Sequence, residues 1–327
     1  MTIGNLMRLL SDGEIHSGEQ LGEALGISRA AVWKQLKKLE TAGVEVSAVK
    51  GRGYQLAQPL TPLDGARIVS HLPAEARRRL ARLLVEDTLP SSNDYLRQRF
   101  SQGAGHGEVC LVEQQSAGRG RRGRAWLTPW GQSLMLSIGW RFDSGVAALE
   151  GLSLAIGVVV SRVLERYGAR PQLKWPNDIL LATPEGALAK LAGILVEVTG
   201  DAAGPCEVVL GVGMNLFLPE SARDAIGQPV AVLADACPGV DRNALAAEVV
   251  AGLLEMLDTF ETEGFAAWQA EWNRRHAYAG HSVDVLVGND QSIAVAGEVD
   301  SNGNLWVSEN GTERPLAGGE ISVRGRP

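Results

Sequence analysis

The most restrictive feature of this sequence is the stretch Gly118–Trp126, in which three glycines and four arginines fill the first seven positions. The glycine spacing is that of a dinucleotide-binding turn, but such a turn must be followed by an apolar helix. Arginines, Pro129 and Gly131 follow instead, which excludes that kind of domain here. Arginine matches phosphate oxygens in pairs, and glycine lets backbone amides approach an anion. We therefore predict that this segment, the arginine loop, closes over phosphate; the alternative is a solvated basic loop or a nucleic-acid patch.

Length and composition limit the class of protein. The 327 residues suffice for two or three domains, and 45% hydrophobic with 21% charged residues is ordinary for a soluble globular protein. The net charge of −7 means that any contact with nucleic acid must come from a local patch. Three widely spaced cysteines indicate neither a disulfide framework nor a zinc site. The longest apolar stretch, residues 152–160, is too short to cross a membrane, so we expect a cytoplasmic protein without a membrane partner.

The N-terminal residues have the pattern of three short helices. Ser17 and Gln20 form a capping box for the second helix, and Gly26 ends it. Ser28 then caps the third helix. Two helices joined by so short a turn indicate a helix-turn-helix.

Alternating residues over 44–49 and 53–56 predict a hairpin with a basic tip, which would form the wing of a winged helix-turn-helix domain over residues 1–60. From Arg29 to Arg52, six basic residues against two acidic ones give a local charge of +4. We expect this surface to bind DNA, although small helical domains also mediate protein contacts. The candidate DNA-binding residues are Ser28, Arg29, Lys34, Lys37, Lys50 and Arg52.

A linker at about residues 58–66 separates this domain from a second one, predicted over residues 66–276. Near its start, Ser91-Ser92-Asn93 precede a predicted helix, so two hydroxyls and an amide lie where free backbone amides favour an anionic or carbonyl oxygen. Helix capping alone is the alternative explanation. A strand over residues 108–115 follows, and the arginine loop comes directly after it.

Two further stretches carry polar groups in a constrained setting. In Lys174-Trp175-Pro176-Asn177-Asp178, the lysine could contact phosphates and the carboxylate a magnesium ion. Lys190 begins an apolar strand, either as an edge residue or as a functional cation. Gly211 and Gly213 lie on one face of another strand, so either a ligand or a packed helix must approach that face closely.

The last part of the chain, residues 277–327, reads as short alternating strands separated by turns such as Gly288-Asn289-Asp290 and Asn310-Gly311. This pattern predicts a small antiparallel barrel.

These motifs together resemble the biotin protein ligases. With the helix-turn-helix in front, and with Gly318–Arg324 as a further matching motif, the chain is similar to the bifunctional biotin ligase and biotin operon repressor over essentially its whole length. The resemblance implies an α+β fold: a winged helix-turn-helix, a central mixed-sheet domain of the class II synthetase-like type, and a C-terminal SH3-like barrel. It also implies a two-step enzyme that makes biotinyl-5′-adenylate from biotin and ATP, with Mg²⁺, and passes biotin to one lysine of a biotin carboxyl carrier protein, an acetyl-CoA carboxylase subunit. Operator DNA and a ligand-promoted homodimer are the further partners that it implies.

The resemblance also assigns residues to roles. Catalysis falls to Lys190, Arg121 and Arg119, and the tentative Mg²⁺ ligand is Asp178. The residues implied for biotin are Ser91, Ser92, Asn93, Gln115, Gly118, Arg119, Gly120, Arg121, Lys190 and Gly193. Those implied for ATP are Arg121, Arg122, Trp126, Lys174, Asn177 and Asn215.

Two departures from the family pattern stand out: Ser92 replaces an expected threonine, and residues 183–187 lengthen a hairpin that is usually tight. Two other functions compete. A lipoate ligase would share the catalytic fold, but that family lacks the arginine loop and its tryptophan. A transcription regulator that only senses a ligand would not need Lys190, Arg119 and Arg121, all of which are present.

Overall fold

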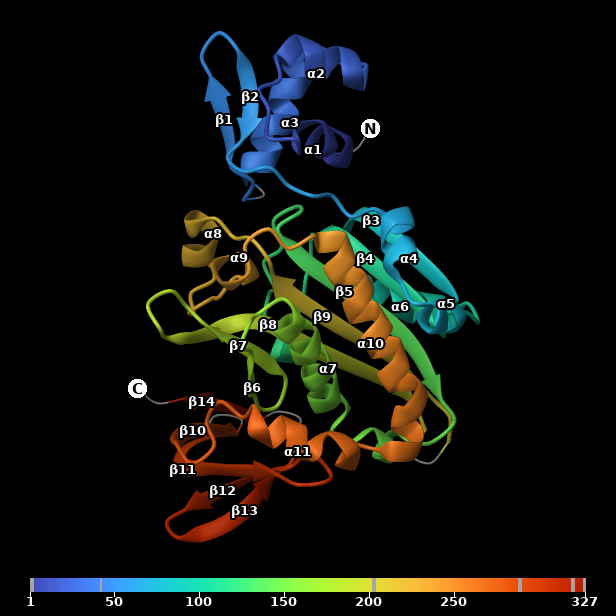
Figure 1. Ribbon diagram of the computed structural model, residues 1–327, viewed down its shortest axis with the longest axis vertical. Helices are drawn as coiled ribbons and strands as arrows, with labels where there is room; N and C mark the ends of the chain where they lie inside the picture. The colour runs from blue at the N-terminus through green and yellow to red at the C-terminus, as the bar shows by residue number, and fades with distance from the viewer. Residues whose placement is uncertain (1–2, 42, 202–203, 288–289, 319–320, 326–327) are drawn as a thin grey trace.

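The computed structural model describes residues 3–41, 43–201, 204–287, 290–318 and 321–325. Figure 1 shows three parts along the long axis: a small N-terminal domain, a large central sheet with its helices, and a C-terminal sheet. Gly288 and Asn289 of the predicted turn, and Gly319 and Glu320 of the C-terminal motif, lie outside the described residues.

The N-terminal domain is the predicted helix-turn-helix with a wing. Its helices are α1 (Ile3–Leu10), α2 (Gly18–Leu25) and α3 (Arg29–Thr41), and its hairpin consists of β1 (Val46–Val49) and β2 (Gly53–Leu56). The capping box is present, since the Gln20 amide donates to Ser17 Oγ at 3.1 Å and the Ser17 amide donates to Gln20 Oε1 at 2.9 Å. Gly26 ends α2 in the left-handed conformation with φ 66°, which glycine adopts without strain.

One residue from elsewhere completes the core of this domain. Trp130, which follows the arginine loop, is fully buried in one cluster with Leu6, Leu36 and Leu56 of the helices and the wing. A salt bridge of 2.6 Å from Arg8 to Asp87 of the central sheet adds a polar contact between the two domains. The N-terminal domain therefore packs directly on the central part.

The central sheet has seven strands in the order β3-β4-β5-β9-β8-β7-β6. The pair β3 and β4 is parallel and the other neighbours are antiparallel, which confirms the predicted mixed sheet. The strands are β3 (Arg82–Leu89), β4 (Glu108–Gln115), β5 (Ser133–Phe142), β6 (Gln172–Lys174), β7 (Asp178–Ala182), β8 (Leu188–Gly200) and β9 (Cys206–Asn215).

The two faces of this sheet are covered differently. Alternate residues such as Val109 and Leu210 belong to the main core with α7 (Leu152–Arg166) and α10 (Arg242–Glu263). Cys110 and Val209, one position along each strand, face the other way and pack on α6 (Ser92–Ser101). The face with α6 is also the face that carries the site. The remaining helices are α4 (Gly65–His71), α5 (Ala74–Arg79), α8 (Glu220–Ala225), α9 (Leu233–Ala236) and α11 (Ala266–Arg274), with short 3₁₀ turns at Arg121–Gly123 and Val146–Leu149.

Within the described part of the chain, the segment Val146–Arg166 is the one helix long and apolar enough to span a membrane. Its most apolar window is 61% buried inside the protein, where it packs between the sheet and α10. It is a core helix of this fold.

The C-terminal part is a five-stranded antiparallel sheet in the order β13-β12-β11-β10-β14. Among the described residues, no pairing joins β13 to β14, so the sheet is open and the expected closed barrel is not seen. The strands are β10 (Ser282–Val287), β11 (Asp290–Val299), β12 (Leu305–Glu309), β13 (Thr312–Leu316) and β14 (Ile321–Gly325).

Candidate active site

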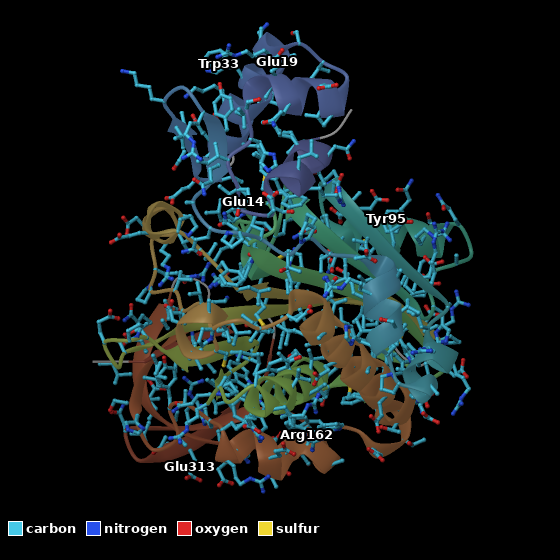
Figure 2. All side chains as sticks on the ribbon, turned by 45° about the horizontal axis from the view of Figure 1, so that its top comes forward. Glu14, Glu19, Trp33, Tyr95, Arg162 and Glu313 are labelled. Atoms are coloured by element: carbon cyan, nitrogen blue, oxygen red, sulfur yellow. The ribbon has the colours of Figure 1, made fainter. Side chains whose placement is uncertain are left out.

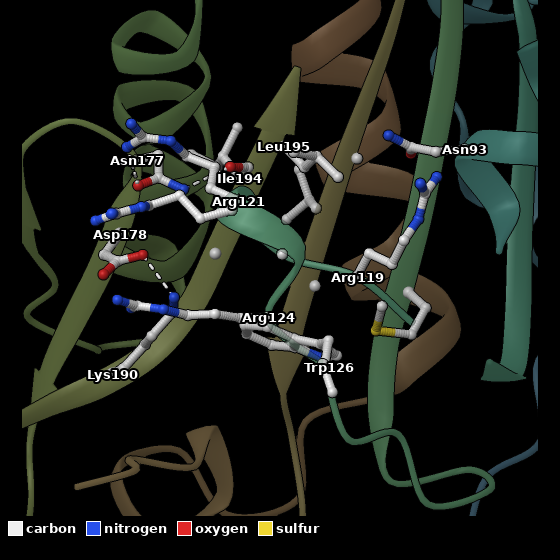
Figure 3. A pocket seen from close by; sticks show the side chains of 18 of the residues that line it. Asn93, Arg119, Arg121, Arg124, Trp126, Asn177, Asp178, Lys190, Ile194 and Leu195 are labelled. Carbon is white, nitrogen blue, oxygen red and sulfur yellow. Dashed lines mark hydrogen bonds and ion pairs between the residues drawn. The ribbon is translucent and has the colours of Figure 1, made fainter. Parts of the chain in front are cut away.

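Most of the predicted site residues converge on one cavity of about 760 Å³. It lies between the arginine loop, the start of α6, the hairpin of β6 and β7, and strands β8 and β9 (Figure 3). Gly118 and Asn215 are not among the residues that line it. The predicted residues that do line it are Ser91, Ser92, Asn93, Gln115, Arg119, Gly120, Arg121, Arg122, Trp126, Lys174, Asn177, Asp178, Lys190 and Gly193.

The start of α6 presents a buried set of hydroxyls and amides. Ser91 is the N-cap, and its Oγ accepts from the Asp94 amide at 3.3 Å, so Ser92 and Asn93 belong to the first turn rather than to the preceding loop. The backbone amide of Ser92 donates to Gln115 Oε1 at 2.8 Å. The Ser92 hydroxyl lies 3.0 Å from the same oxygen and 2.7 Å from the hydroxyl of Ser137. This end of the cavity is a neutral hydrogen-bonding cradle.

The arginine loop folds back on itself. The Gly120 amide donates to the Arg124 carbonyl at 2.8 Å, and the Trp126 amide donates to the Gly118 carbonyl at 2.9 Å. Gly118 therefore shapes the base of the loop instead of facing the cavity. Arg122 has φ 58°, in the left-handed region that glycine usually occupies.

Two arginines of the loop reach opposite sides of the site. Arg119 donates to Asp94 Oδ1 of α6 at 2.5 Å, and Arg121 donates to Asn177 Oδ1 of the β6–β7 hairpin at 3.1 Å. Burial lowers the pKa of Arg121, and the nearby charge of Asp178 partly offsets that effect. The loop is thus tied to the cradle on one side and to the hairpin on the other.

Glycines make room for the side chains that lie on the sheet. A methyl group at Gly213 would lie 2.9 Å from the Trp126 indole, and one at Gly193 would lie 3.0 Å from it. A methyl group at Gly211 would lie 2.5 Å from Asn93 Oδ1. The two alternating glycines of β9 are therefore approached by a loop indole and by a side chain from the first turn of α6.

The opposite end of the cavity gathers charge around Asp178. Its Oδ1 accepts from Lys190 Nζ at 2.6 Å, and its Oδ2 lies 3.3 Å from Lys174 Nζ. Lys190 Nζ also lies 5.2 Å from the centre of the Trp126 ring. Burial on its own would raise the pKa of Asp178, but the two lysine charges outweigh it and hold that pKa below its usual value. Figure 3 shows Asp178 and Lys190 on the far side of the cavity from Asn93.

Asn215 does not line the cavity but is hydrogen-bonded to the backbone of residues close to it. Its amide donates to the carbonyls of Lys190 and Ala231, each at 3.4 Å, and the Ala231 amide donates back to the Lys190 carbonyl at 3.0 Å. These bonds join Lys190 of β8 to Ala231, and the Lys190 amide also donates to the carbonyl of Pro229, the last residue of the segment 226–229 that lines the cavity. Asn215 thus orders two cavity walls without reaching the space between them.

Sequence reasoning missed several members of the site. Ser137 lines the cradle, Arg124 lines the cavity, and Asp94 and Glu197 fix side chains that do so. Ser137 and Glu197 come from strands β5 and β8, whose alignment depends on long-range pairing. The glycines at 211 and 213 were the one local signal that side chains crowd this face.

The predicted DNA-binding residues lie on the surface of the N-terminal domain. Ser28 caps α3 by accepting from the Ala31 amide at 3.2 Å. Trp33 is 51% exposed on the same helix, at the far end of the molecule in Figure 2. The basic residues Arg29, Lys34, Lys37, Lys50 and Arg52 are all exposed.

Comparison with known proteins finds a family match for the N-terminal part and another for the central part of the chain. Residues 85–215 match the Biotin/lipoate A/B protein ligase family, and residues 5–55 match an HTH domain. The bifunctional ligase/repressor BirA of Salmonella typhimurium is 40% identical over 320 residues, 98% of this chain and 96% of that protein. BirA of Escherichia coli is 38% identical over the same shares. The biotin--[acetyl-CoA-carboxylase] ligase of Mycobacterium tuberculosis is 33% identical over 71% of this chain and 85% of its own length.

Solved structures share the fold. The biotin protein ligase from Aquifex aeolicus, determined in complex with biotin and ATP, has a TM-score of 0.63 at 23% identity and covers 76% of this chain and 100% of its own. That likeness concerns the fold, whereas relatives at 38–40% identity span almost the whole chain. The chain therefore belongs to the bifunctional ligase/repressor family of biotin protein ligases.

Proposed function

We propose that the cavity holds biotin and ATP together, with the head group of biotin in the cradle and the triphosphate at the lysine end. The protein is a biotin protein ligase: it joins biotin and ATP to biotinyl-5′-adenylate and transfers the biotinyl group to a carrier protein. Its helix-turn-helix makes it a repressor as well. The observation that carries the placement is one continuous cavity with neutral hydrogen-bonding groups at one end and Arg121, Lys174 and Lys190 at the other.

The cradle suits the head group of biotin, a cyclic urea that offers both N–H donors and a carbonyl acceptor. We assign Ser92 and Gln115 to it directly, because both are buried and line the cavity. Ser91 and Asn93 act by fixing the first turn of α6. Gly120 leaves room for the chain of the ligand, Gly193 makes room for the Trp126 indole and the Lys190 side chain beside it, and Gly118 supports the loop.

In the first step, a carboxylate oxygen of biotin attacks the α-phosphorus of ATP, and the bond to the β-phosphate oxygen breaks to release pyrophosphate. Negative charge accumulates on the phosphoryl oxygens, so catalysis consists mostly of positioning and charge neutralisation. We propose that Lys190 and Arg121 supply the neutralising charge. Both are already oriented, Lys190 by Asp178 and Arg121 by Asn177. Arg119, which is paired with Asp94, holds the loop over the ligand.

For the nucleotide we propose Trp126, Lys174 and Asn177 as contacts, with Arg122 at the loop tip and Asn215 acting from behind. We also propose that Mg²⁺ arrives with the phosphates. Among the described residues that line the cavity, Asp178 is the only carboxylate, and its Oδ2 has the looser lysine contact. Magnesium in nucleotide sites often uses one carboxylate with phosphate oxygens and waters, so this residue fits such an ion. Once bound, the ion would neutralise phosphate charge.

In the second step, the amine of the carrier lysine attacks the acyl carbon of the adenylate, forming an amide and releasing AMP and a proton. The protein needs no nucleophile of its own. It must hold the mixed anhydride away from water until the carrier arrives, and a loop anchored on both sides of the cavity is suited to that task.

We propose a ligand-promoted homodimer that uses the open edge of β8. Strand β7 pairs with β8 only as far as Gly193, whereas β9 pairs with β8 as far as Gly200. Asn177 also bonds to the amide and the carbonyl of Ile194, so within the described chain residues 195–200 of β8 have a strand on one side only. A free strand edge can accept a second copy of the chain or an extended segment of the carrier, which would make repression and carrier binding mutually exclusive.

The domain division 1–60, 66–276 and 277–327 is likewise our proposal. The N-terminal core forms a cluster of its own, completed by Trp130. In the C-terminal part, β10 pairs with both β11 and β14, a strand order that a partly closed SH3-like barrel would have. A cytoplasmic location is the remaining expectation.

The function is tested by ATP-dependent transfer of labelled biotin to a purified biotin carboxyl carrier domain. Transfer should require ATP, release pyrophosphate in the first step, and label a single lysine. Lipoate in place of biotin should give no transfer. A protein that binds biotin without any pyrophosphate release would instead be a sensor.

A further inference from the structure

We propose that Glu197 is a positioning residue that sets the hydrogen-bond polarity of the biotin cradle through a relay of side chains. Glu197 does not line the cavity. It lies on β8, in the segment with the open edge, and no motif of the sequence draws attention to it. The inference rests on the proposed placement of the biotin head group at Ser92 and Gln115.

The relay is continuous and made of short bonds. Asn93 Nδ2 donates to Glu197 Oε2 at 2.8 Å, and Ser137 Oγ donates to Asn93 Oδ1 at 2.6 Å. The hydroxyls of Ser137 and Ser92 are 2.7 Å apart, and Ser92 lies 3.0 Å from Gln115 Oε1. Ser92, Asn93 and Ser137 are 3%, 5% and 0% exposed, so water cannot replace any of these partners. At sites buried this deeply, each hydrogen bond polarises the next.

The carboxylate of Glu197 fixes the donor and the acceptor of every hydrogen bond in this relay. Because it can only accept, the amide of Asn93 must turn its NH₂ group toward Glu197 and its carbonyl toward Ser137. Ser137 has one hydroxyl hydrogen, which it then gives to Asn93, so its oxygen can only accept from Ser92. The Ser92 hydrogen therefore points into the protein, whether toward Ser137 or toward Gln115. Both lone pairs of Ser92 Oγ are left to accept an N–H of a cyclic urea.

The same polarity extends to Gln115. Its Oε1 accepts from the backbone amide of Ser92, so its NH₂ group is the end that remains to donate. The cradle thus offers the ligand an acceptor at Ser92 Oγ and a donor at the NH₂ group of Gln115. If the relay ran the other way, Ser137 would donate to Ser92 and occupy one of its lone pairs.

The surroundings hold Glu197 in place for this role. Its other oxygen, Oε1, lies 3.4 Å from Arg97 and 3.7 Å from Arg119. Gly211 leaves the space that the Asn93 amide occupies, since a methyl group there would lie 2.5 Å from Asn93 Oδ1. In Figure 3, Asn93 and Arg119 lie together at one end of the cavity, away from Asp178 and Lys190. An effect of Glu197 should therefore fall on biotin and not on ATP.

The first test is Glu197→Gln, assayed by biotin-dependent pyrophosphate release. An amide can present either a donor or an acceptor to Asn93, so both relay directions become possible. We expect the KM for biotin to rise about five- to tenfold, the scale of one hydrogen bond between neutral groups, while the KM for ATP stays within about twofold. Glu207→Gln is the matched control, because Glu207 is also a strand carboxylate paired with an arginine, Arg141 at 2.9 Å, but lies outside the cavity and the relay.

The decisive test exchanges donor and acceptor. Asn93→Asp alone places two carboxylates against each other and should raise the KM for biotin more than tenfold. In the double variant Asn93→Asp with Glu197→Gln, the introduced glutamine donates to the introduced aspartate, which still accepts from Ser137, so the original direction returns. The KM for biotin should come back to within about threefold of the unmodified protein. A double variant no better than Asn93→Asp, or an unchanged KM in Glu197→Gln, would overturn the relay.

Ser92→Ala separates this proposal from the placement of biotin. If Ser92→Ala leaves the KM for biotin unchanged, the head group does not bind in the cradle and the proposed site is wrong. If Ser92→Ala raises that KM while Glu197→Gln does not, the placement stands and the relay alone is wrong. Thermal unfolding of each variant identifies a loss of the fold. Such a loss would lower kcat and the kcat/KM values for biotin and for ATP together.

Discussion

Lys190→Met removes one charge from the lysine end of the cavity and keeps most of the side chain. In the native protein the ammonium lies 2.6 Å from Asp178 and 5.2 Å from the centre of the Trp126 ring. Methionine retains an apolar stem that can pack beside Gly193 and the indole. The variant therefore tests the charge and leaves the packing largely intact.

The expected loss of adenylation is about a hundred- to a thousandfold in kcat/KM, the scale for removing one preorganised group that stabilises charge in a transition state. Stability should fall as well, because Asp178 keeps only Lys174, at 3.3 Å. Breaking a fully buried pair costs about 3–5 kcal/mol. Since the Lys190 side chain is 21% exposed and a second lysine remains, about 1–3 kcal/mol is reasonable here.

The stability effect has a defined pH dependence. The pKa of Asp178 is depressed in the folded protein, so its ion pairs stabilise the fold above the unfolded pKa, and that contribution is lost as the pH falls through the folded pKa. The difference between native protein and variant should therefore shrink in acid, where the carboxylate is protonated in both. Adding Asp178→Asn to Lys190→Met should recover stability at pH 7 without recovering activity.

Pyrophosphate release measures the first effect and denaturant unfolding the second. A loss of activity below about threefold, in a variant that is folded at the assay temperature, would make Lys190 an edge residue and would remove it from the chemistry. A large loss that Asp178→Asn repairs would show that Lys190 acts only by holding the structure.

Three other predictions follow from the geometry. Gly213→Ala puts a methyl group 2.9 Å from the Trp126 indole. Because this overpacks the indole, the KM for ATP should rise about five- to a hundredfold, whereas the KM for biotin should change little. An unchanged KM for ATP would exclude the indole from the nucleotide site. Burial lowers the pKa of His276 to about 4. As the pH falls, this histidine is therefore protonated in the unfolded chain before it is protonated in the folded protein. The free energy of unfolding should fall by roughly 3 kcal/mol between about pH 6.5 and about pH 4. His276→Asn should flatten that slope. Biotin with ATP should raise both the self-association constant in sedimentation and the affinity for operator DNA at fixed salt, and no change in either would remove the proposed coupling.

Local features of the fold could be predicted because they depend on neighbouring residues. The capping box at Ser17, the left-handed Gly26 and the strand over residues 108–115 all agree with the structure. The arginine loop was recognisable because its composition has few structural uses. The sequence predicted that α6 begins after Asn93, whereas it begins at Ser92. A serine can cap a helix or occupy its first turn, and only the backbone conformation distinguishes the two.

Other features depend on which strands become neighbours, and they could not be predicted. Ser137 pairs with Gly211 across β5 and β9, which brings the hydroxyl beside Asn93. Nothing within ten residues of Ser137 signals this contact. The open C-terminal sheet is a similar case, because alternation predicts strands but not whether the last pair closes. Gly211 and Gly213 indicated a close approach without indicating which groups would make it.

Trp130 has a consequence for how this protein can be divided. In sequence it belongs to the ligase, just after the arginine loop, but its indole is fully buried in the core of the N-terminal domain. A ligase truncated before residue 60 would expose this large apolar ring on its surface, and an isolated N-terminal fragment would have a hole where the ring belongs. Truncation should therefore leave the first piece prone to aggregation and the second poorly folded. The two activities share a side chain, and neither half is a detachable module.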